Sequence, residues 1–303
     1  MSRTLIVATR KSQLALAQSR AWMRALEAAR PDVKCEELHV TTTGDRIQDR
    51  ALSQIGGKGL FIKEIEEAIL AGQAQLAVHS MKDVPAELAP GLEIGCVPLR
   101  EDPRDVAVTR SGKPLAELPS GAKVGTSSLR RAVQISAWRQ DLVIVPLRGN
   151  VDTRLRKCQE GEVDAILLAR AGLARLGLLD RVTETLEPEL VLPAVGQGAL
   201  AIELASGDDG SRTQVAALDD PDTHVAVAAE RGLMLAVDGN CQVPVAAFAQ
   251  RIDDEMRLRG MLANPDGSQL RRREVVVAWP GSSDEAHRIG LELGRELAGA
   301  AVG

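Results

Sequence analysis

The sequence contains no tyrosine and only two phenylalanines, and aromatic residues make up 2% of its 303 residues. Proteins that bind single-stranded nucleic acid stack the bases on aromatic side chains and usually carry a basic surface. This chain has few such side chains and a formal net charge of -5. Nucleic acid is therefore a poor candidate partner, and small carboxylated or phosphorylated ligands suit the chain better.

Long apolar segments and cysteine motifs are also missing. No apolar run approaches the roughly 20 residues that a membrane helix needs. Residues 1–10 have neither the apolar length nor the cleavage pattern of a signal peptide, so we expect a cytoplasmic protein with no membrane partner. The four cysteines are widely spaced, without a Cys-x-x-Cys pair, which argues against a disulfide framework and against a metal site. We expect Cys35, Cys96 and Cys158 to be buried thiols.

Positive charge is concentrated in the middle of the chain. Residues 1–120 hold 16 basic and 16 acidic side chains, residues 121–181 hold 11 and 6, and residues 182–303 hold 10 and 20. A basic segment within an acidic protein attracts anions locally. We therefore expect residues 121–181 to contribute to a site for small anionic ligands.

The first two-thirds of the chain alternates strand and helix signals. Short apolar segments such as 5–9 and 76–80 are predicted strands, and segments such as 60–70 and 128–138 have the apolar spacing of helices. A second run of the same kind starts near Asp105. Because a chain of this length suits two or three domains, the alternation predicts two α/β units with largely parallel sheets.

Polar motifs in both units fall where a predicted strand ends and a helix begins, which is where open α/β sheets bind ligands. We expect the two crevices to face each other across short hinges near 99–104 and 190–200. After a polar loop at 206–211 the pattern changes to one helix, three antiparallel strands and a final helix. The predicted fold class is therefore α/β, with a smaller C-terminal α+β domain.

One motif combines hydroxyl groups with arginines at the start of a helix. The backbone amides and hydroxyls of Thr126, Ser127 and Ser128 can form an anion seat at a helix N-terminus. Arg130 and Arg131 follow in the first helical turn, where positive charge opposes the helix dipole unless an anion compensates it. This placement favours a ligand, and the alternative is a solvated surface helix.

Further arginines stand at predicted strand ends. Arg10 ends the first strand, shortly before Ser12, which can cap the helix that follows. Arg148 ends a later strand, and Arg154 lies one turn into the helix that Asn150 can cap. The guanidinium fork binds carboxylates in a bidentate manner. Several arginines at the same edge of the sheets predict a ligand with many carboxylates.

Lys82 and Asp83 follow the predicted strand at 76–80. A carboxylate beside a lysine stays ionised, because the cation favours its charged form. Such a group can stabilise a cation or transfer a proton. The alternative is a surface ion pair without a catalytic role.

Cys241 lies in a glycine-containing loop, Gly239-Asn240-Cys241-Gln242-Val243-Pro244, before the C-terminal strands. A nucleophilic cysteine needs an activating base, and none of the four histidines has a local spacing that marks it as one. A covalent anchor needs no permanent base and fits equally well. The residues alone thus predict a polycarboxylate-binding α/β protein with a candidate catalytic aspartate and an unusual thiol.

Several long motifs then identify a resemblance. The sequence resembles the porphobilinogen deaminase, or hydroxymethylbilane synthase, family over essentially its whole length. The motifs that carry the resemblance stand in one order along the chain: 8–12 (ATRKS), 56–61 (GGKGLF), 79–85 (HSMKDVP), 100–105 (REDPRD), 124–131 (VGTSSLRR), 147–150 (LRGN), 192–198 (LPAVGQG) and 241–244 (CQVP).

The resemblance implies a fold and a reaction. The fold comprises two lobes like those of type II periplasmic binding proteins and a third domain with the cofactor cysteine. We expect domain 1 at 1–99 with 195–218, domain 2 at 100–194 and domain 3 at 219–303. The implied enzyme is a transferase that links four porphobilinogen molecules head to tail, losing ammonia each time, on a covalently attached dipyrromethane primer. It then releases the linear tetrapyrrole hydroxymethylbilane.

The resemblance also implies residue roles. Cys241 corresponds to the attachment site of the dipyrromethane, through a thioether. Asp83 corresponds to the catalytic carboxylate, which would hydrogen-bond pyrrole N–H groups and stabilise the cation left when ammonia departs. The residues implied to contact the cofactor or growing chain are Ser80, Lys82, Thr126, Ser127, Ser128, Arg130, Arg131 and Arg154. Those implied to hold carboxylates of substrate or product are Arg10, Ser12, Gln18, Lys58, Arg148 and Arg175. Phe61 corresponds to an aromatic residue near the active site.

Each porphobilinogen carries two carboxylates, so every elongation adds two negative charges, in keeping with the arginine surplus. One carboxylate must serve every step, so the chain or the domains must shift between steps. The family often has glycine where this sequence has Asn240. The difference affects the expected shape of the loop, but it does not affect the thioether chemistry. The implied protein is a monomer without metal. A solute-binding or sensing protein with the same two-lobed fold, or an inactive relative, is the alternative class.

Overall fold

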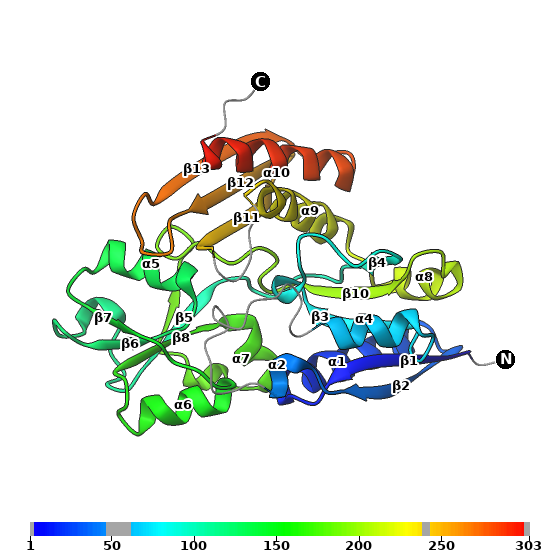
Figure 1. Ribbon diagram of the computed structural model, residues 1–303, viewed down its shortest axis with the longest axis horizontal. Helices are drawn as coiled ribbons and strands as arrows, with labels where there is room; N and C mark the ends of the chain where they lie inside the picture. Colours follow the sequence, from blue (N-terminus) through cyan, green and yellow to red (C-terminus); the bar gives the residue numbers. More distant parts are fainter. Residues whose placement is uncertain (1–2, 47–61, 238–242, 300–303) are drawn as a thin grey trace.

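The computed structural model describes residues 3–46, 62–237 and 243–299. Three sheets organise these residues: two mixed five-stranded sheets and one antiparallel three-stranded sheet (Figure 1). Lys58, Phe61, Asn240 and Cys241, which the sequence singles out, lie outside the described residues.

The first lobe contains two stretches of the chain. Its elements are β1 (Arg3–Arg10), α1 (Gln13–Ala29), β2 (Val33–Val40), α2 (Thr43–Arg46), α4 (Lys63–Leu70), β3 (Leu76–Ser80), η1 (Met81–Asp83), β4 (Leu92–Cys96), β10 (Leu200–Ala205), α8 (Asp209–Val215) and η4 (Ala216–Leu218). The strand order is β2-β1-β3-β10-β4. Leu5 on one face of the sheet packs with Trp22 of α1, and Ala8 on the other face packs with Ile65 of α4. Helices therefore cover both faces of this sheet.

The second lobe repeats this plan with the intervening residues. Its elements are β5 (Asp105–Thr109), η2 (Leu115–Glu117), β6 (Lys123–Gly125), α5 (Leu129–Trp138), β7 (Val143–Val145), α6 (Val151–Gln159), β8 (Ala165–Ala169), α7 (Arg170–Leu176), η3 (Leu179–Arg181) and β9 (Glu184–Leu186). The strand order is β7-β6-β8-β5-β9. Ile135 of α5 packs with Val124 and Leu167 on one face, and Leu155 of α6 packs with Ile166 on the other.

Each lobe has one strand that runs against the others. β1 is parallel to β2 and β3, and β6 is parallel to β7 and β8. β10 is antiparallel to β3 and β4, and β5 is antiparallel to β8 and β9. β5 and β10 follow the two segments by which the chain passes from one lobe to the other, the outward crossing (97–104) and the return crossing (187–199). The carboxyl ends of the parallel strands therefore share one edge in each lobe, and the predicted polar motifs stand at those ends.

The C-terminal domain lies across both lobes (Figure 1). Its elements are α9 (Pro221–Ala236), β11 (Val245–Ile252), β12 (Glu255–Leu262), β13 (Arg271–Ala278) and α10 (Ser283–Ala298). The sheet is antiparallel in the order β11-β12-β13. α9 and α10 cross closely at Gly232 and Gly290, where a Cβ atom would collide with the backbone of the facing helix. The other sheet face packs Met261 against Val133 of α5 and Leu192.

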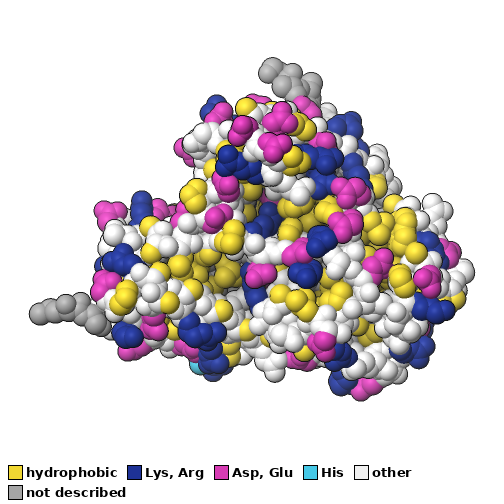
Figure 2. All heavy atoms as spheres, turned by 180° about the vertical axis from the view of Figure 1, so that it is seen from behind, with side chains coloured by type: hydrophobic (Ala, Val, Ile, Leu, Met, Phe, Trp, Pro, Cys, Tyr) yellow, Lys and Arg dark blue, Asp and Glu magenta, His cyan; other side chains and the backbone are white. Residues whose placement is uncertain are grey.

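Glu230 of α9 joins the two crossing segments to the C-terminal domain. Its carboxylate is fully buried and accepts bonds from Arg100 Nη1 at 2.6 Å, the Gly196 amide at 2.6 Å and the Ala249 amide at 3.0 Å. Arg100 and Gly196 belong to the outward and the return crossing, so one carboxylate ties both to α9. Figure 2 shows the hollow at this junction from behind, with hydrophobic and basic side chains along it.

The predicted fold class, two α/β lobes followed by a smaller α+β domain, is confirmed. The predicted caps of α1 and α6 are also confirmed, because Ser12 Oγ accepts from the Ala15 amide and Asn150 Oδ1 from the Thr153 amide. The domain boundaries stay predictions. No helix within the described ranges is both long and apolar enough to span a bilayer.

Candidate functional site

Five of the predicted residues meet at the carboxyl edge of the first lobe. Arg10, Ser12, Gln18, Ser80 and Asp83 line a small cavity of about 60 Å³. Gln18 Nε2 donates to Ser80 Oγ at 2.8 Å, so this amide is already engaged within the protein. The position of β1 beside β3 in the sheet brings these side chains together across about 70 residues of sequence.

Lys82 and Asp83 form the short η1 turn directly after β3. Both side chains reach solvent, but protein surrounds the Lys82 ammonium. Desolvation lowers the pKa of Lys82 to about 8; the charge of Asp83 opposes this shift, and Arg131 adds to it. Charges of the second lobe therefore affect the pKa of Lys82, which belongs to the first lobe.

A buried carboxylate holds the two arginines of the second lobe. Asp105 is fully buried, and Arg130 and Arg131 are each 6% exposed. Arg130 Nη1 donates to Asp105 Oδ2 at 2.6 Å, and Arg131 Nη2 and Nε donate to Oδ1 at 2.7 and 3.0 Å. Burial alone would raise the pKa of Asp105, but the two guanidiniums outweigh it and hold that pKa well below its usual range. The sequence predicts an anion beside Arg130 and Arg131. The carboxylate of Asp105 is such an anion, and it belongs to the protein itself.

Other groups complete the shell of these arginines. The Gln197 amide donates to Asp105 Oδ1 at 3.1 Å and to the Pro103 carbonyl at 2.6 Å. Arg130 also donates to the Leu192 carbonyl at 2.7 Å. The crossing segments are therefore bonded directly to the cluster formed by Asp105, Arg130 and Arg131.

The three predicted hydroxyls serve local structure. Ser128 Oγ caps α5 by accepting from the Arg131 amide, and Thr126 Oγ1 accepts from the Ser128 amide at 3.2 Å. Ser127 Oγ donates to the Leu147 carbonyl at 2.9 Å. The anion seat at this helix start stays a prediction. The Thr126 and Ser128 hydroxyls accept these bonds and keep an O–H that can donate to an anion, whereas the Ser127 O–H is already engaged.

Arg148 and Arg154 add positive charge beside the same cluster. Burial, together with the charges of Arg131 and Arg148, lowers the pKa of Arg154 to about 10. Arg154 Nε donates to the Gly149 carbonyl at 2.8 Å. Among the described residues, Lys82, Arg148 and Arg154 have no carboxylate within ion-pair distance. Repulsion among the basic side chains of this cluster favours the binding of an anion with several carboxylates.

Arg175 lies apart from this group, at the contact between the lobes. Its Nη2 donates to the Gly198 carbonyl at 2.6 Å, and burial lowers its pKa against the opposing charge of Glu101. The structure thus links Arg175 of α7 to the return crossing. Its role toward substrate carboxylates stays a prediction.

Sequence reasoning missed two buried acidic groups near the site. Asp105 stands in the 100–105 motif, but no spacing along the chain joins it to Arg130 and Arg131. Glu203 of β10 accepts from His79 Nε2 at 2.9 Å, and the two residues are 124 positions apart. Only the pairing of β10 with β3 reveals this contact.

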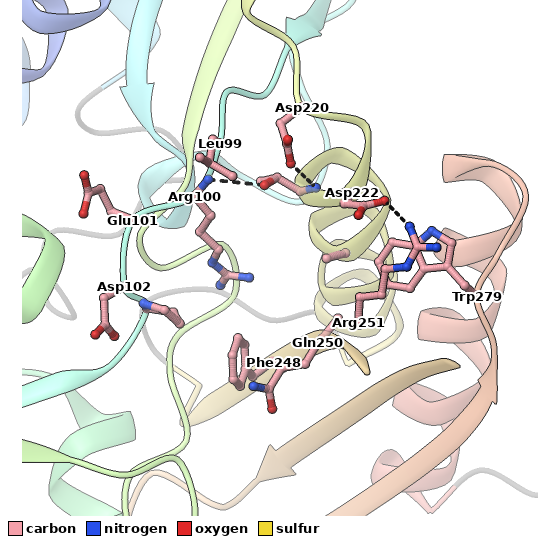
Figure 3. Close-up of a pocket in the computed structure, with 14 residues that line it drawn as sticks. Leu99, Arg100, Glu101, Asp102, Asp220, Asp222, Phe248, Gln250, Arg251 and Trp279 are labelled. Carbon is pink, nitrogen blue, oxygen red and sulfur yellow. Dashed lines mark hydrogen bonds and ion pairs between the residues drawn. The ribbon is translucent and has the colours of Figure 1, made fainter. Parts of the chain in front are cut away.

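A larger cavity of about 280 Å³ holds none of the predicted site residues (Figure 3). It lies between the outward crossing, the start of α9 and β11. Most of its charged side chains are engaged with protein groups: Arg251 bonds Asp222 at 2.8 Å and stacks on Trp279, Asp220 caps α9, Arg100 bonds Glu230, and Asp102 bonds Arg104. We therefore place the candidate active site at Arg148 and Arg154 of the second lobe, which have no carboxylate within ion-pair distance among the described residues, and not at this cavity.

Two lobes, a crevice with clustered cations and one exposed carboxylate define an enzyme that acts on a polycarboxylated substrate. The chain belongs to the porphobilinogen deaminase family. Residues 5–213 match the family description "Porphobilinogen deaminase, dipyromethane cofactor binding domain", and residues 224–299 match "Porphobilinogen deaminase, C-terminal domain".

Full-length relatives agree with this family. The chain is 60% identical to the porphobilinogen deaminase of Sorangium cellulosum strain So ce56, over 98% of this chain and 99% of the relative. It is 54% identical to that of Syntrophobacter fumaroxidans, over 97% of this chain and 94% of the relative. The predicted activity is thereby confirmed: the chain is a transferase of tetrapyrrole biosynthesis that condenses porphobilinogen with the help of a dipyrromethane cofactor.

Similar solved structures include solute-binding proteins. The extracellular-binding protein ytmK of Bacillus subtilis, a probable amino-acid transporter component, has a TM-score of 0.45 at 11% identity, over 71% of this chain and 90% of that one. The methionine-binding protein MetQ has a TM-score of 0.45 at 10% identity, over 71% of this chain and 89% of that one.

Proposed function

We propose that the crevice between the lobes holds the dipyrromethane and the growing chain through Lys82, Arg148 and Arg154. The observation that carries this proposal is the cluster of cations without carboxylate partners. Repulsion among these cations destabilises the crevice when it holds no anion, and each bound carboxylate relieves part of that repulsion. Arg130 and Arg131 face the same crevice but share Asp105, so they contribute fixed positive potential more than free hydrogen-bond donors.

Arg10 and Ser12 are proposed to receive the carboxylates of the incoming porphobilinogen, with Lys58 and Arg175 as further contacts. Ser80, Thr126, Ser127 and Ser128 are proposed as weaker polar contacts, because neighbouring groups already engage them. Gln18 is proposed to act through Ser80, which it orients. The incoming substrate would thus lie at the carboxyl edge of β1 and β3, next to Asp83.

Asp83 is proposed as the catalytic carboxylate. Its exposed oxygens can accept hydrogen bonds from pyrrole N–H groups, and its negative charge favours the positive charge that develops on the substrate as ammonia leaves. The dipyrromethane supplies the terminal pyrrole carbon that attacks the activated substrate.

Cys241 is proposed as the thioether anchor. The other three cysteines are poor thiolates: burial raises the pKa of Cys35 to about 11, and it also raises the pKa values of Cys96 and Cys158. We further propose a cytoplasmic monomer that needs no metal and no membrane partner, with domains at 1–99 with 195–218, 100–194 and 219–303.

Intact mass under denaturing conditions tests the anchor. We expect the wild type and Cys35→Ser to carry the added mass of two linked porphobilinogen-derived rings, and Cys241→Ser to have the bare sequence mass. If the wild type is bare, incubation with porphobilinogen should add the same mass. An adduct that persists in Cys241→Ser, or a wild type that never gains one, would contradict the proposal.

A further inference from the structure

Arg231 of α9 reaches from the C-terminal domain to the loop that carries Asp83. Its Nη2 donates to the Pro85 carbonyl at 2.8 Å and to the Ala86 carbonyl at 3.0 Å. Its Nη1 lies 3.9 Å from Met81 Sδ. One guanidinium thus binds the loop on both sides of Asp83, although about 145 residues separate the two segments.

The surrounding packing fixes this contact. Val227 lies one turn before Arg231, on the same face of α9, and packs in one apolar cluster with Met81 and Val84. Gly196 of the return crossing is pressed against Met81, where a Cβ atom would collide with the methionine side chain. The loop at 81–86 is therefore enclosed between α9 and the return crossing.

A purely structural role does not explain the charge of Arg231. Burial lowers the pKa of Arg231 to about 10, against the opposing effect of Glu203, which is near but not in direct contact. Arg231 is partly buried, and among the described residues no carboxylate lies within ion-pair distance of its guanidinium, so no direct ion pair offsets its charge. What the guanidinium supplies is a set of directed donors to backbone carbonyls two and three residues after Asp83.

We propose that Arg231 is a positioning residue for the condensation reaction. It holds the Asp83 loop at a fixed place relative to α9. This inference rests on the proposed role of Asp83. α9 ends at Ala236, and Cys241 follows it closely in the sequence. Arg231 therefore ties the catalytic carboxylate to the helix from which the chain continues to the proposed primer anchor.

Arg272 provides a matched control. Its Nη1 donates to the Glu189 carbonyl at 2.7 Å and its Nη2 to the Leu190 carbonyl at 3.3 Å. Like Arg231 it joins the C-terminal domain to backbone carbonyls of another segment, here the start of the return crossing, and its Nη2 also donates to Gln134 Oε1 of α5 at 3.0 Å. None of these groups belongs to the loop at 81–86. Arg272→Gln thus removes a comparable clamp without touching the Asp83 loop.

The experiment compares Arg231→Gln, Arg231→Lys and Arg272→Gln as primer-loaded enzymes, with loading checked by intact mass. Misplacement of a catalytic group by about 1 Å can reduce a rate by about 10²-fold. We expect kcat for porphobilinogen consumption to fall about 10- to 100-fold in Arg231→Gln, with KM changed less than about threefold. Arg231→Lys should recover part of kcat, and Arg272→Gln should keep the wild-type value.

Melting midpoints of all three variants separate positioning from loss of fold. Equal kcat in Arg231→Gln and Arg272→Gln would overturn the inference, as would a fall in kcat no larger than the fall in folded fraction. If Arg231→Gln does not fold, Arg231→Lys decides: a reduced kcat at unchanged KM supports positioning, and a wild-type kcat overturns it. A wild type that neither carries the adduct nor consumes porphobilinogen would refute the proposed function instead.

Discussion

Replacement of Asp105 by asparagine should strongly destabilise the protein. The side chain is fully buried and bonds Arg130, Arg131 and Gln197. Asparagine has nearly the same shape, so the substitution removes the charge while it leaves little cavity. Two buried guanidiniums then share no counter-charge. Removal of one partner from a buried ion pair costs about 3–5 kcal/mol.

A loss of this size corresponds to a fall in melting temperature of roughly 6–20 °C, at about 2–4 °C per kcal/mol for a large domain. The matched control is Asp141→Asn. Asp141 also binds an arginine in a bidentate manner, with Nε and Nη2 of Arg139 at 2.7 Å, but that pair is exposed. Exposed pairs are screened by water and salt, so the control should melt close to the wild type.

The pH dependence adds a second test of the same reasoning. The folded-state pKa of Asp105 lies below its unfolded value, so its stabilisation is complete above about pH 3.9 and is lost as the pH falls below that value. The difference in unfolding free energy between wild type and Asp105→Asn should therefore be constant from pH 5 to 7 and shrink below pH 4. Urea unfolding over this range measures it. A difference no larger than that of Asp141→Asn at pH 7 would refute the assigned role of Asp105.

Two further predictions concern Asp83 and Lys82. Asp83→Asn should reduce kcat by about 10²–10⁴-fold. The melting temperature should not fall, because the Asp83 side chain is exposed. Steady-state kinetics and a melting curve test both expectations, and a kcat near that of the wild type would exclude the catalytic role. Desolvation lowers the pKa of Lys82 to about 8 in the folded protein, against about 10.4 in the unfolded chain. Between these two values the unfolded chain binds more protons than the folded one. The free energy of unfolding of the primer-free protein should therefore rise with pH in this range. Lys82→Gln should abolish that rise in unfolding free energy, and an unchanged slope would show that another group causes it.

Local signals in the sequence were sufficient for the elements and their class. Ser12 and Asn150 cap the helices that they were expected to cap, because an N-cap depends only on neighbouring residues. The alternation of strands and helices likewise predicted two α/β lobes. The direction of β5 and β10 was not predictable, because it depends on partners that the chain reaches only after it has crossed between lobes.

The candidate site was predicted only in part for the same reason. Arginines and hydroxyls at strand ends were visible in the sequence, and the two lobes bring most of them together. The carboxylate that satisfies Arg130 and Arg131 was not recognisable, because Asp105 precedes them by about 25 residues and starts a strand. In the sequence, Arg231 is one charged residue among others on a predicted helix. Its contact with the Asp83 loop depends on tertiary packing and is seen only in the structure.

The distribution of counter-charges divides the basic residues of the crevice into two kinds. Arg130 and Arg131 share Asp105, so their geometry is set before any ligand binds, and they can hold a fixed positive potential without moving. Among the described residues, Lys82, Arg148 and Arg154 have no carboxylate within ion-pair distance, and the charge of Arg131 acts against both Lys82 and Arg154, so each carboxylate that enters relieves repulsion. A chain that gains two carboxylates per elongation needs both kinds. We propose that the fixed pair keeps the reacting end in register with Asp83, and that Lys82, Arg148 and Arg154 exchange one carboxylate for the next as the product lengthens.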